Sequence, residues 1–337
     1  MKAMILRHTV SLEETDKPLE LAEVPTPKAG HGEVLLQVLT CGVCHTELDE
    51  IEGRVSPSKW PIILGHEVVG RVAEIGSGVT QYKEGDRLGV GWVHCSSGSV
   101  DENLSSQFRA TGCDVDGGYA EFMTVREDYA YPVPEIFSNE QAAPLLCAGA
   151  IGYRALKLTN LVDGQRLGFT GFGGSAHLVI QLARHMFPNS EFYVFARDDE
   201  TRAFARHLGA VWAGDTSDRA PAKLHAIIDT TPAWKPVVEA MKNLAPGGRL
   251  VINAIRKEDT DKASLQELNY HDDLWMEREV KSVANITHHD IREFLPLAAN
   301  IPIQPKVETY CFEDANRAIV ELKRGQIQGA KVLLIGV

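Results

Sequence analysis

The sequence predicts an α/β protein with two domains: a β-rich, barrel-like domain and a doubly wound domain built on a parallel sheet. Three observations lead to this prediction. The chain has 337 residues, and roughly 150 residues make a typical domain. Residues 1–150 are rich in Gly, Val and turn-forming residues, whereas beyond residue 150 short apolar runs alternate with stretches of helical period. Such alternation is typical of βαβ units.

The β-rich domain is expected to comprise residues 1–150 and 286–337, because the last segment is expected to return to the first domain. Residues 33–39 and 68–75 are apolar runs of strand length bounded by glycine-containing turns, which predicts short strands. The serine-rich stretch 96–106 is expected to be an exposed loop.

The second domain, residues 151–285, is expected to carry the parallel sheet, since right-handed crossover connections join successive strands of such sheets. The predicted strands are 166–170, 192–195, 226–229 and 250–252, and the predicted helices are 178–183, 201–208 and 237–244.

Charge and composition exclude several classes of protein. The 34 basic and 46 acidic residues give a net charge of −12, whereas nucleic-acid binding needs a basic surface that neutralises phosphates. No apolar stretch is long enough to span a bilayer, and residues 1–6 are too short an apolar start for a signal peptide. Six cysteines are too sparse for a disulfide scaffold. We therefore expect a cytoplasmic protein without nucleic-acid or membrane partners.

A glycine motif at 171–176 matches G-x-G-x-x-G/A, directly after a predicted strand and before a predicted helix. This context favours a Rossmann dinucleotide site over a glycine turn that binds nothing. The first glycine permits a tight turn, the second lets the backbone approach a pyrophosphate, and a small sixth residue lets helix and strand pack closely. The predicted coenzyme-binding residues are Gly171, Gly173, Gly174, Ser175 and Ala176.

The residues after the next strand bear on the choice of coenzyme. The residue 20 positions past Ala176 is Ala196, which cannot bind a ribose hydroxyl as an acid would. Arg197 follows, and a guanidinium suits a 2′-phosphate. Asp198 and Asp199 favour NAD(H) instead, since either carboxylate could bond a ribose hydroxyl or repel a phosphate. The sequence favours NADP(H), with NAD(H) as the alternative; Arg197 could also be an ordinary surface arginine.

A second group of residues indicates a metal site. Cys41 and Cys44 form a C-x2-C pair, but no second pair completes a zinc ribbon. The other candidate ligands are His66, Glu67 and Cys147. Two thiolates and one imidazole leave a fourth position open, which is typical of catalytic zinc.

The sequence resembles the zinc-dependent medium-chain alcohol dehydrogenases over nearly its whole length. The resemblance implies a GroES-like catalytic domain, a Rossmann domain and hydride transfer between NAD(P)(H) and an alcohol, aldehyde or ketone in the cleft between them. It also implies a homodimer or homotetramer. The segments that carry it are 41–47, 65–70, 85–92, 116–121, 143–149 and 171–176.

The resemblance assigns the metal ligands. It implies Cys44, His66 and Cys147 as the zinc ligands and Glu67 as an acid beside the metal or an alternative ligand. Glu47 stands where the family usually has Asp, a residue that bonds the zinc-bound histidine.

Further roles are implied around this centre. Thr46 resembles the hydroxyl that takes the alcohol proton, although taken alone it could be a helix N-cap. His45 resembles the residue that faces the pyrophosphate, and Asn285 lies near the nicotinamide in the family. Trp92 and Trp60 lie near the metal motifs in the sequence and are expected to line the substrate pocket.

Two departures from the family pattern stand out. Asp49 replaces the histidine that often ends the proton relay, so the proton would pass through this carboxylate, through water, or not by this route. Of the four cysteines that usually hold a structural zinc in a lobe after Trp92, only Cys95 remains. We therefore expect one zinc per subunit. The pair at 288–289, two histidines remote from these motifs, is expected to lie in a solvated loop.

Two other functions fit parts of the pattern. A zinc-free quinone or enoyl reductase of the same fold would need the metal ligands to be absent or idle, and the intact ligand set argues against it. The other is a non-catalytic protein that binds NADP(H).

Overall fold

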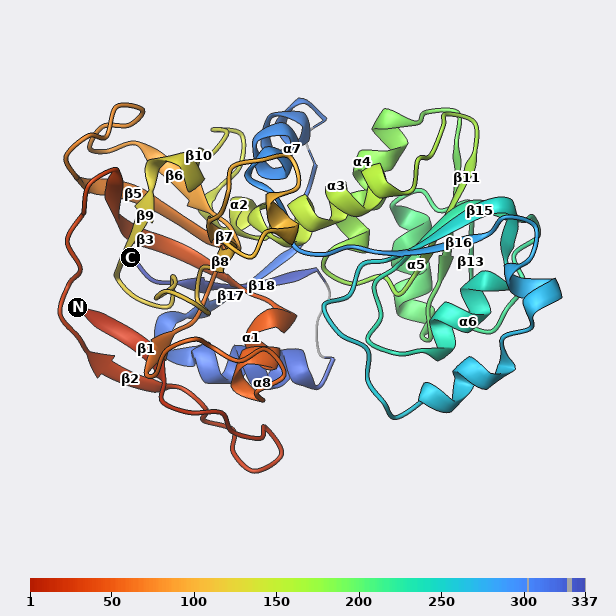
Figure 1. Ribbon diagram of the computed structural model, residues 1–337, viewed down its shortest axis with the longest axis horizontal. Helices are drawn as coiled ribbons and strands as arrows, with labels where there is room; N and C mark the ends of the chain where they lie inside the picture. Colours follow the sequence, from red (N-terminus) through yellow and green to blue (C-terminus); the bar gives the residue numbers. More distant parts are fainter. Residues whose placement is uncertain (302, 326–328, 337) are drawn as a thin grey trace. The chain divides into compact units, whose positions relative to one another are not determined.

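A computed structural model describes residues 1–301, 303–325 and 329–336 of the chain. The contacts divide the chain into two compact units, one of Met1–Ala150 with Asn285–Val337 and one of Ile151–Ala284. Figure 1 shows the elements of both units. Within the described ranges, no helix combines the length and apolar character needed to cross a membrane.

The first unit is built around the long strand β3 (Glu33–Val43). Strands β5, β9 and β18 pair with β3 antiparallel, whereas β17 pairs with β18 parallel. In the described residues its main sheet has the order β10-β6-β5-β3-β18-β17, and β9 also pairs with β3. Two smaller sheets have the orders β2-β1-β4 and β7-β8. The strands are β1 (Lys2–Leu6), β2 (Glu20–Glu23), β4 (Ile62–Ile63), β5 (Val68–Ile75), β6 (Arg87–Val90), β7 (Val93–Cys95), β8 (Arg109–Ala110), β9 (Phe122–Arg126), β10 (Ala130–Pro132), β17 (Val307–Cys311) and β18 (Ala330–Leu334).

Short helices connect and cover these strands. Helix α3 begins in the first unit and continues into the second. The helices that lie or begin in the first unit are α1 (His45–Ile51), η1 (Glu102–Leu104), η2 (Glu127–Tyr129), α2 (Asn139–Ala142), η3 (Ala143–Leu146), α3 (Ala148–Leu158), α7 (His288–Asn300), η6 (Phe312–Asp314) and α8 (Ala315–Lys323).

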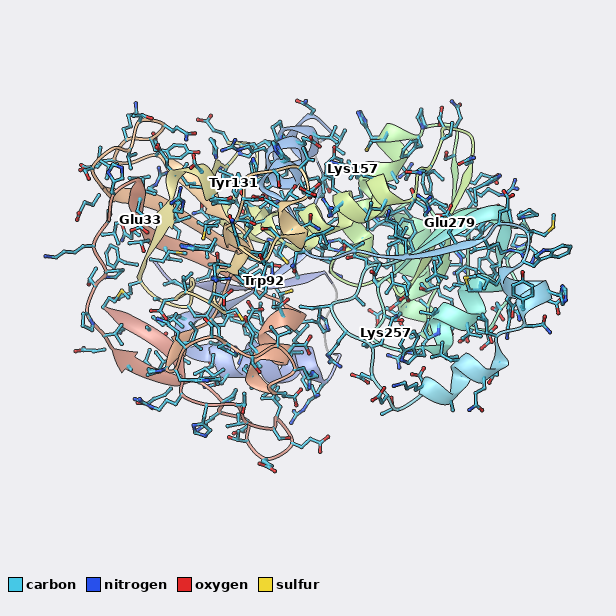
Figure 2. All side chains as sticks on the ribbon, in the orientation of Figure 1. Glu33, Trp92, Tyr131, Lys157, Lys257 and Glu279 are labelled. Carbon is cyan, nitrogen blue, oxygen red and sulfur yellow. The ribbon has the colours of Figure 1, made fainter. Side chains whose placement is uncertain are left out.

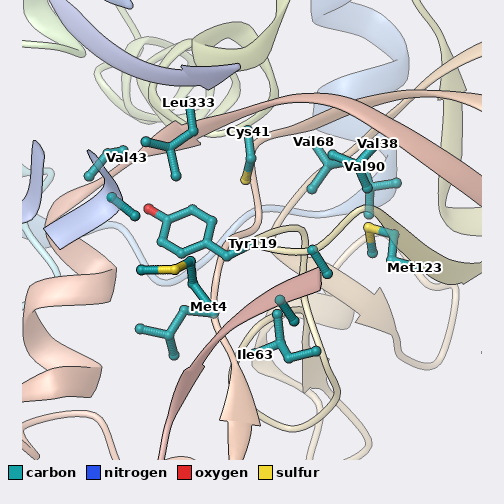
Figure 3. Close-up of a cluster of buried hydrophobic side chains, with 14 of the residues drawn as sticks. Met4, Val38, Cys41, Val43, Ile63, Val68, Val90, Tyr119, Met123 and Leu333 are labelled. Carbon is teal, nitrogen blue, oxygen red and sulfur yellow. The ribbon is translucent and has the colours of Figure 1, made fainter. Parts of the chain in front are cut away.

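The register of β3 and β5 positions the candidate metal site. Cys41, near the end of β3, pairs with Val68, the first residue of β5. The residues just after β3 and just before β5 are therefore neighbours. A buried apolar cluster beneath them includes Met4, Cys41, Val68 and Tyr119 (Figure 3). Burial of such side chains is the main stabilising contribution to the unit.

The second unit is a parallel sheet with the strand order β13-β12-β11-β14-β15-β16 in the described residues. The order reverses between β11 and β14, and the carboxyl ends at such a switch point form a binding crevice. This confirms the predicted fold class. The elements are β11 (Arg166–Thr170), α4 (Ala176–Met186), β12 (Glu191–Phe195), α5 (Asp199–His207), β13 (Trp212–Gly214), β14 (Leu224–Asp229), α6 (Lys235–Met241), β15 (Leu244–Ile252), η4 (Lys262–Glu267), η5 (Tyr270–Leu274) and β16 (Glu279–Ser282).

Some local predictions were wrong. The helix predicted over 237–244 ends at Met241, and Leu244 already begins β15. The stretch 96–106 is not exposed throughout, because Glu102 and Asn103 are buried. His288 is buried as well, as the first residue of α7. A local pattern of polar residues did not reveal these buried partners.

Candidate active site

Helix α1 sets the geometry of the candidate metal site. Cys44 is its N-cap residue, which excludes the alternative that Thr46 is the cap. The backbone N–H of Cys44 donates a hydrogen bond to Glu47 Oε2 at 2.8 Å. The Thr46 hydroxyl oxygen then lies 3.7 Å from the Cys44 sulfur.

Four potential ligands converge beside this helix. The ligand atoms of Cys44, His66, Glu67 and Cys147 all lie within 4.8 Å of one another. The two sulfur atoms are 4.0 Å apart, and His66 Nε2 lies 3.2 Å from the Cys147 sulfur. Zn–S bonds of about 2.3 Å at a tetrahedral angle place two sulfur atoms roughly 3.8 Å apart. The donor set and its spacing therefore fit a tetrahedral zinc ion.

The two thiols are joined by a hydrogen bond. Their mutual hydrogen bond lowers the pKa of Cys44 well below its ordinary value and raises that of Cys147 well above it. Metal binding requires both groups as thiolates, so a bound cation would displace the shared proton.

Glu47 orients the imidazole. Its Oε1 lies 2.7 Å from His66 Nδ1, and both side chains are fully buried. Burial raises the pKa of Glu47, and the charge of His66 opposes this rise. Because Nδ1 faces the carboxylate, Nε2 is directed toward the sulfur atoms, the arrangement of many metal-binding histidines.

Glu67 fills a space that only glycine leaves open. A Cβ atom on Gly42 would lie 1.8 Å from Glu67 Oε2. Burial raises the pKa of the Glu67 carboxyl well above its usual range. Gly42 is therefore a site residue that the sequence argument missed, although its position inside the C-x2-C pair was a signal.

Asp49 does not lie free at the surface. It is fully buried, and Arg54 Nε donates to its Oδ1 at 2.6 Å. The backbone N–H groups of Arg54 and Val55 also donate to the Asp49 carbonyl. Asp49 is thus held in an ion pair with Arg54.

Trp92, labelled in Figure 2, packs against the His66 imidazole. The rings of His66 and Trp92 meet edge to face with centroids 4.9 Å apart. Trp92 Nε1 donates to Asn285 Oδ1 at 3.1 Å, and Asn285 Nδ2 donates to the Asn103 carbonyl at 3.4 Å. Trp60, by contrast, is 43% exposed. His45, the first residue of α1, is also exposed.

The glycine motif forms the turn between β11 and α4. Gly171 has φ +76°, and a Cβ there would lie 2.9 Å from Thr230 Oγ1. Gly173 is exposed, and a Cβ built on it meets no atom within 4 Å, which leaves its backbone accessible. Ser175 Oγ accepts from Asn253 Nδ2 at 3.3 Å, and Ala176 is buried at the start of α4. Gly174, between them, is half-buried.

The acids after β12 have local partners. Asp198 is the N-cap of α5 and accepts hydrogen bonds from the Thr201 N–H at 2.7 Å and hydroxyl at 2.8 Å, which lower the pKa of Asp198. Asp199 pairs with Arg202 at 2.7 Å. The Arg197 side chain is exposed, and among the described residues no hydrogen bond or ion pair engages its guanidinium.

A buried ion pair at the carboxyl end of β14 was also missed. Asp229 is fully buried and accepts from the hydroxyls of Thr170 at 2.6 Å and Thr231 at 2.8 Å. Lys257, labelled in Figure 2, donates to Asp229 and to the carbonyls of Thr231 and Ala233. A single Asp at the end of an apolar run was the only sequence signal.

Comparisons with known proteins identify the family. A family model described as "Alcohol dehydrogenase GroES-like domain" matches residues 30–135. The chain is 41% identical over 331 residues to "Probable alcohol dehydrogenase AdhA" from Mycobacterium tuberculosis (strain CDC 1551 / Oshkosh), covering 94% of this chain and 93% of that protein. It is 34% identical over 344 residues to an alcohol dehydrogenase from Geobacillus stearothermophilus, covering 96% and 98%.

A solved structure agrees with these relatives. The structure described as cinnamyl alcohol dehydrogenases (SbCAD4) from Sorghum bicolor (L.) Moench superposes with a TM-score of 0.82 at 25% identity, covering 99% of this chain and 97% of that chain. The chain therefore belongs to the zinc-dependent alcohol dehydrogenase family, as its sequence motifs predicted.

Proposed function

We propose that this protein is a zinc-dependent alcohol dehydrogenase that transfers hydride between NAD(P)(H) and an alcohol, aldehyde or ketone. The convergence of Cys44, His66 and Cys147 carries the proposal, because two thiolates and one imidazole leave one coordination position for water or substrate. We assign these three side chains as ligands and Glu67 as the acid beside the metal.

The residues around the proposed metal site have different roles in the proposed reaction. Bound zinc would polarise the substrate oxygen as a Lewis acid and lower the pKa of an alcohol. Glu47 keeps His66 Nε2 directed toward the ligand sulfurs. The short distance between Thr46 and Cys44 supports Thr46 Oγ1 as the acceptor of the alcohol proton. Since Asp49 is paired with a guanidinium, we propose that the proton leaves Thr46 through water.

Further residues are proposed for the substrate pocket and for coenzyme binding. We propose that Trp92 lines the substrate pocket, with Trp60 as a further wall. We propose that the turn 171–176 binds the coenzyme pyrophosphate and that His45 is a coenzyme-binding residue, as the family resemblance implies. The amide of Asn285 is engaged at both ends. This supports an indirect role for Asn285, which would act beside the nicotinamide by fixing the position of Trp92.

We propose that NADP(H) is the preferred coenzyme and NAD(H) the alternative. The unengaged guanidinium of Arg197 supports this preference, and so do the local hydrogen bonds of the two neighbouring acids. Arg197→Gln is expected to lower kcat/KM for NADP(H) by about 10- to 100-fold, the worth of one charged hydrogen bond, and to leave kcat/KM for NAD(H) unchanged. Equal losses with both coenzymes would refute the preference.

We also propose one zinc per subunit, a homodimer or homotetramer, and a cytoplasmic location. The single cysteine of the lobe supports the zinc count, and all six cysteines are free thiols, which suits a reducing compartment. The exposed edge strand β16 supports assembly of subunits through their sheets. Light scattering measures the oligomer. Elemental analysis after purification without added metal should find one zinc per subunit, whereas two would contradict the count.

Cys44→Ser tests the central assignment, with Cys311→Ser as the matched control at an exposed thiol. The first variant should lose zinc and alcohol turnover and should still bind coenzyme, whereas the control should keep all three. Unchanged turnover in Cys44→Ser would refute the zinc mechanism and favour a zinc-free reductase. A wild-type protein that binds coenzyme but turns over no alcohol would favour the non-catalytic alternative.

A further inference from the structure

A fully buried carboxylate outside the metal site, Glu102, joins three segments of the first unit. Its Oε1 accepts hydrogen bonds from His288 N at 2.6 Å and from His288 Nδ1 at 2.7 Å. Its Oε2 accepts from the Tyr129 hydroxyl at 2.9 Å and from Gly98 N at 3.1 Å. Four donors, from the loop after β7, from η2 and from the first turn of α7, thus meet at one carboxylate. This carboxylate lies at the N-terminus of α7, where the helix dipole favours a negative charge.

Glu102 begins a continuous series of contacts that ends at the candidate metal centre. The next residue, Asn103, offers its carbonyl to the Asn285 amide at 3.4 Å. Asn285 Oδ1 accepts from Trp92 Nε1 at 3.1 Å, and the Trp92 ring packs edge to face on His66. Each link is a direct contact within the same unit.

The backbone at Asn285 indicates that this position is held by its surroundings. Its φ is +51°, a left-handed conformation that most non-glycine residues seldom adopt and that asparagine adopts more readily than most. Such conformations persist where neighbouring contacts determine them. Here those contacts are the two hydrogen bonds of the Asn285 side-chain amide, one to the Asn103 carbonyl and one from the Trp92 indole.

We propose that Glu102 is a positioning residue for the substrate site. By fixing Asn103, it holds Asn285 and thereby keeps the Trp92 indole against His66, at the wall that the alcohol or carbonyl substrate contacts. In the segment after β7, the family resemblance leads one to expect cysteine ligands of a structural zinc. Here the hydrogen bonds of the Glu102 carboxylate hold this segment instead. This inference rests on the proposed function, because that function makes His66 a zinc ligand and Trp92 part of the pocket.

A double-mutant cycle between Glu102→Gln and Trp92→Phe tests the proposal. Glutamine keeps the size of the side chain but turns an NH2 group toward hydrogen-bond donors, and phenylalanine keeps a ring but removes the indole N–H. Glu102→Gln should raise the alcohol KM roughly tenfold, within the range of couplings through contacting residues, and should leave the coenzyme KM and the zinc content unchanged. In the Trp92→Phe background the same substitution should change the alcohol KM less than twofold.

Tryptophan emission gives a readout that is independent of turnover. Glu102→Gln should shift the emission spectrum, and the shift should vanish in the Trp92→Phe background. His288→Asn, whose side-chain amide can replace the Nδ1 donor, should keep the wild-type spectrum and alcohol KM.

Two results would overturn the proposal. One is an effect of Glu102→Gln on alcohol KM that is equal in both backgrounds. The other is an unchanged emission spectrum. If Glu102→Gln does not fold, Tyr129→Phe, which removes one of the four donors, enters the same cycle with a smaller expected effect. If the wild-type protein turns over no alcohol, the proposed function fails, and the emission measurement still decides whether Glu102 positions Trp92.

Discussion

Replacing Glu47 by glutamine is expected to weaken zinc binding without unfolding the protein. The buried carboxylate accepts a hydrogen bond from Cys44 N at 2.8 Å and faces His66 Nδ1 at 2.7 Å. An amide has only one oxygen, so one of these two donors would face an NH2 group. Groups that orient a metal-bound histidine typically contribute about 10- to 100-fold to metal affinity. This factor corresponds to roughly 1.4–2.7 kcal/mol at 25 °C.

Competition with a chromophoric zinc chelator at fixed pH measures this affinity, and circular dichroism verifies the fold. Glu313→Gln is the matched control, because it removes a carboxylate whose side chain is 57% exposed and lies 3.9 Å from Lys2. The reasoning is refuted if Glu47→Gln binds zinc as tightly as the wild type, or if the control loses as much affinity.

Three further outcomes are expected. Thr46→Val should lower kcat by about 10²- to 10⁴-fold, the usual contribution of a proton-transfer group, with zinc content retained; steady-state kinetics and elemental analysis together measure this. Lys257→Met leaves the Asp229 carboxylate buried without its cation and should lower the free energy of unfolding by about 3–5 kcal/mol, as urea titration would show. Asp198→Ala should cost about 0.5–2 kcal/mol through loss of the α5 N-cap. Since hydrogen bonds from Thr201 lower the pKa of Asp198 in the folded state, this cost should be present above the unfolded pKa of about 3.9 and disappear as the pH falls through the lower folded pKa. Urea titrations of wild type and variant at neutral and acidic pH test the sign, and a cost that grows on acidification would contradict it.

The parallel sheet was largely predictable, because its central strands are buried on both faces and stand out as apolar runs between helical stretches. The edge strands β13 and β16 were not predicted. β13 has only three residues, and the sequence of β16, Glu-Val-Lys-Ser, is exposed throughout. Such segments become strands through pairing with a neighbour, and their own residues signal little.

The predicted metal ligands lie together in the structure because their motifs follow and precede paired strands. The network around Glu102 could not be predicted in the same way. Glu102 and His288 are 186 positions apart, and each looks like a solvated polar residue among its sequence neighbours. Only the fold shows that they are buried against each other, and the same holds for Asp229 and Lys257.

The spacing of the two ligand sulfurs has a consequence for handling the protein. The sulfurs of Cys44 and Cys147 lie 4.0 Å apart, and a disulfide bond joins two sulfurs at about 2.05 Å. An oxidant that removes two electrons and two protons from this pair would join the two sulfurs in a disulfide. That disulfide would block the proposed metal site. If these cysteines hold zinc, as we propose, the bound cation would keep them from oxidation. Protein that is stripped by a chelator in air should then regain activity with zinc only after treatment with a reductant.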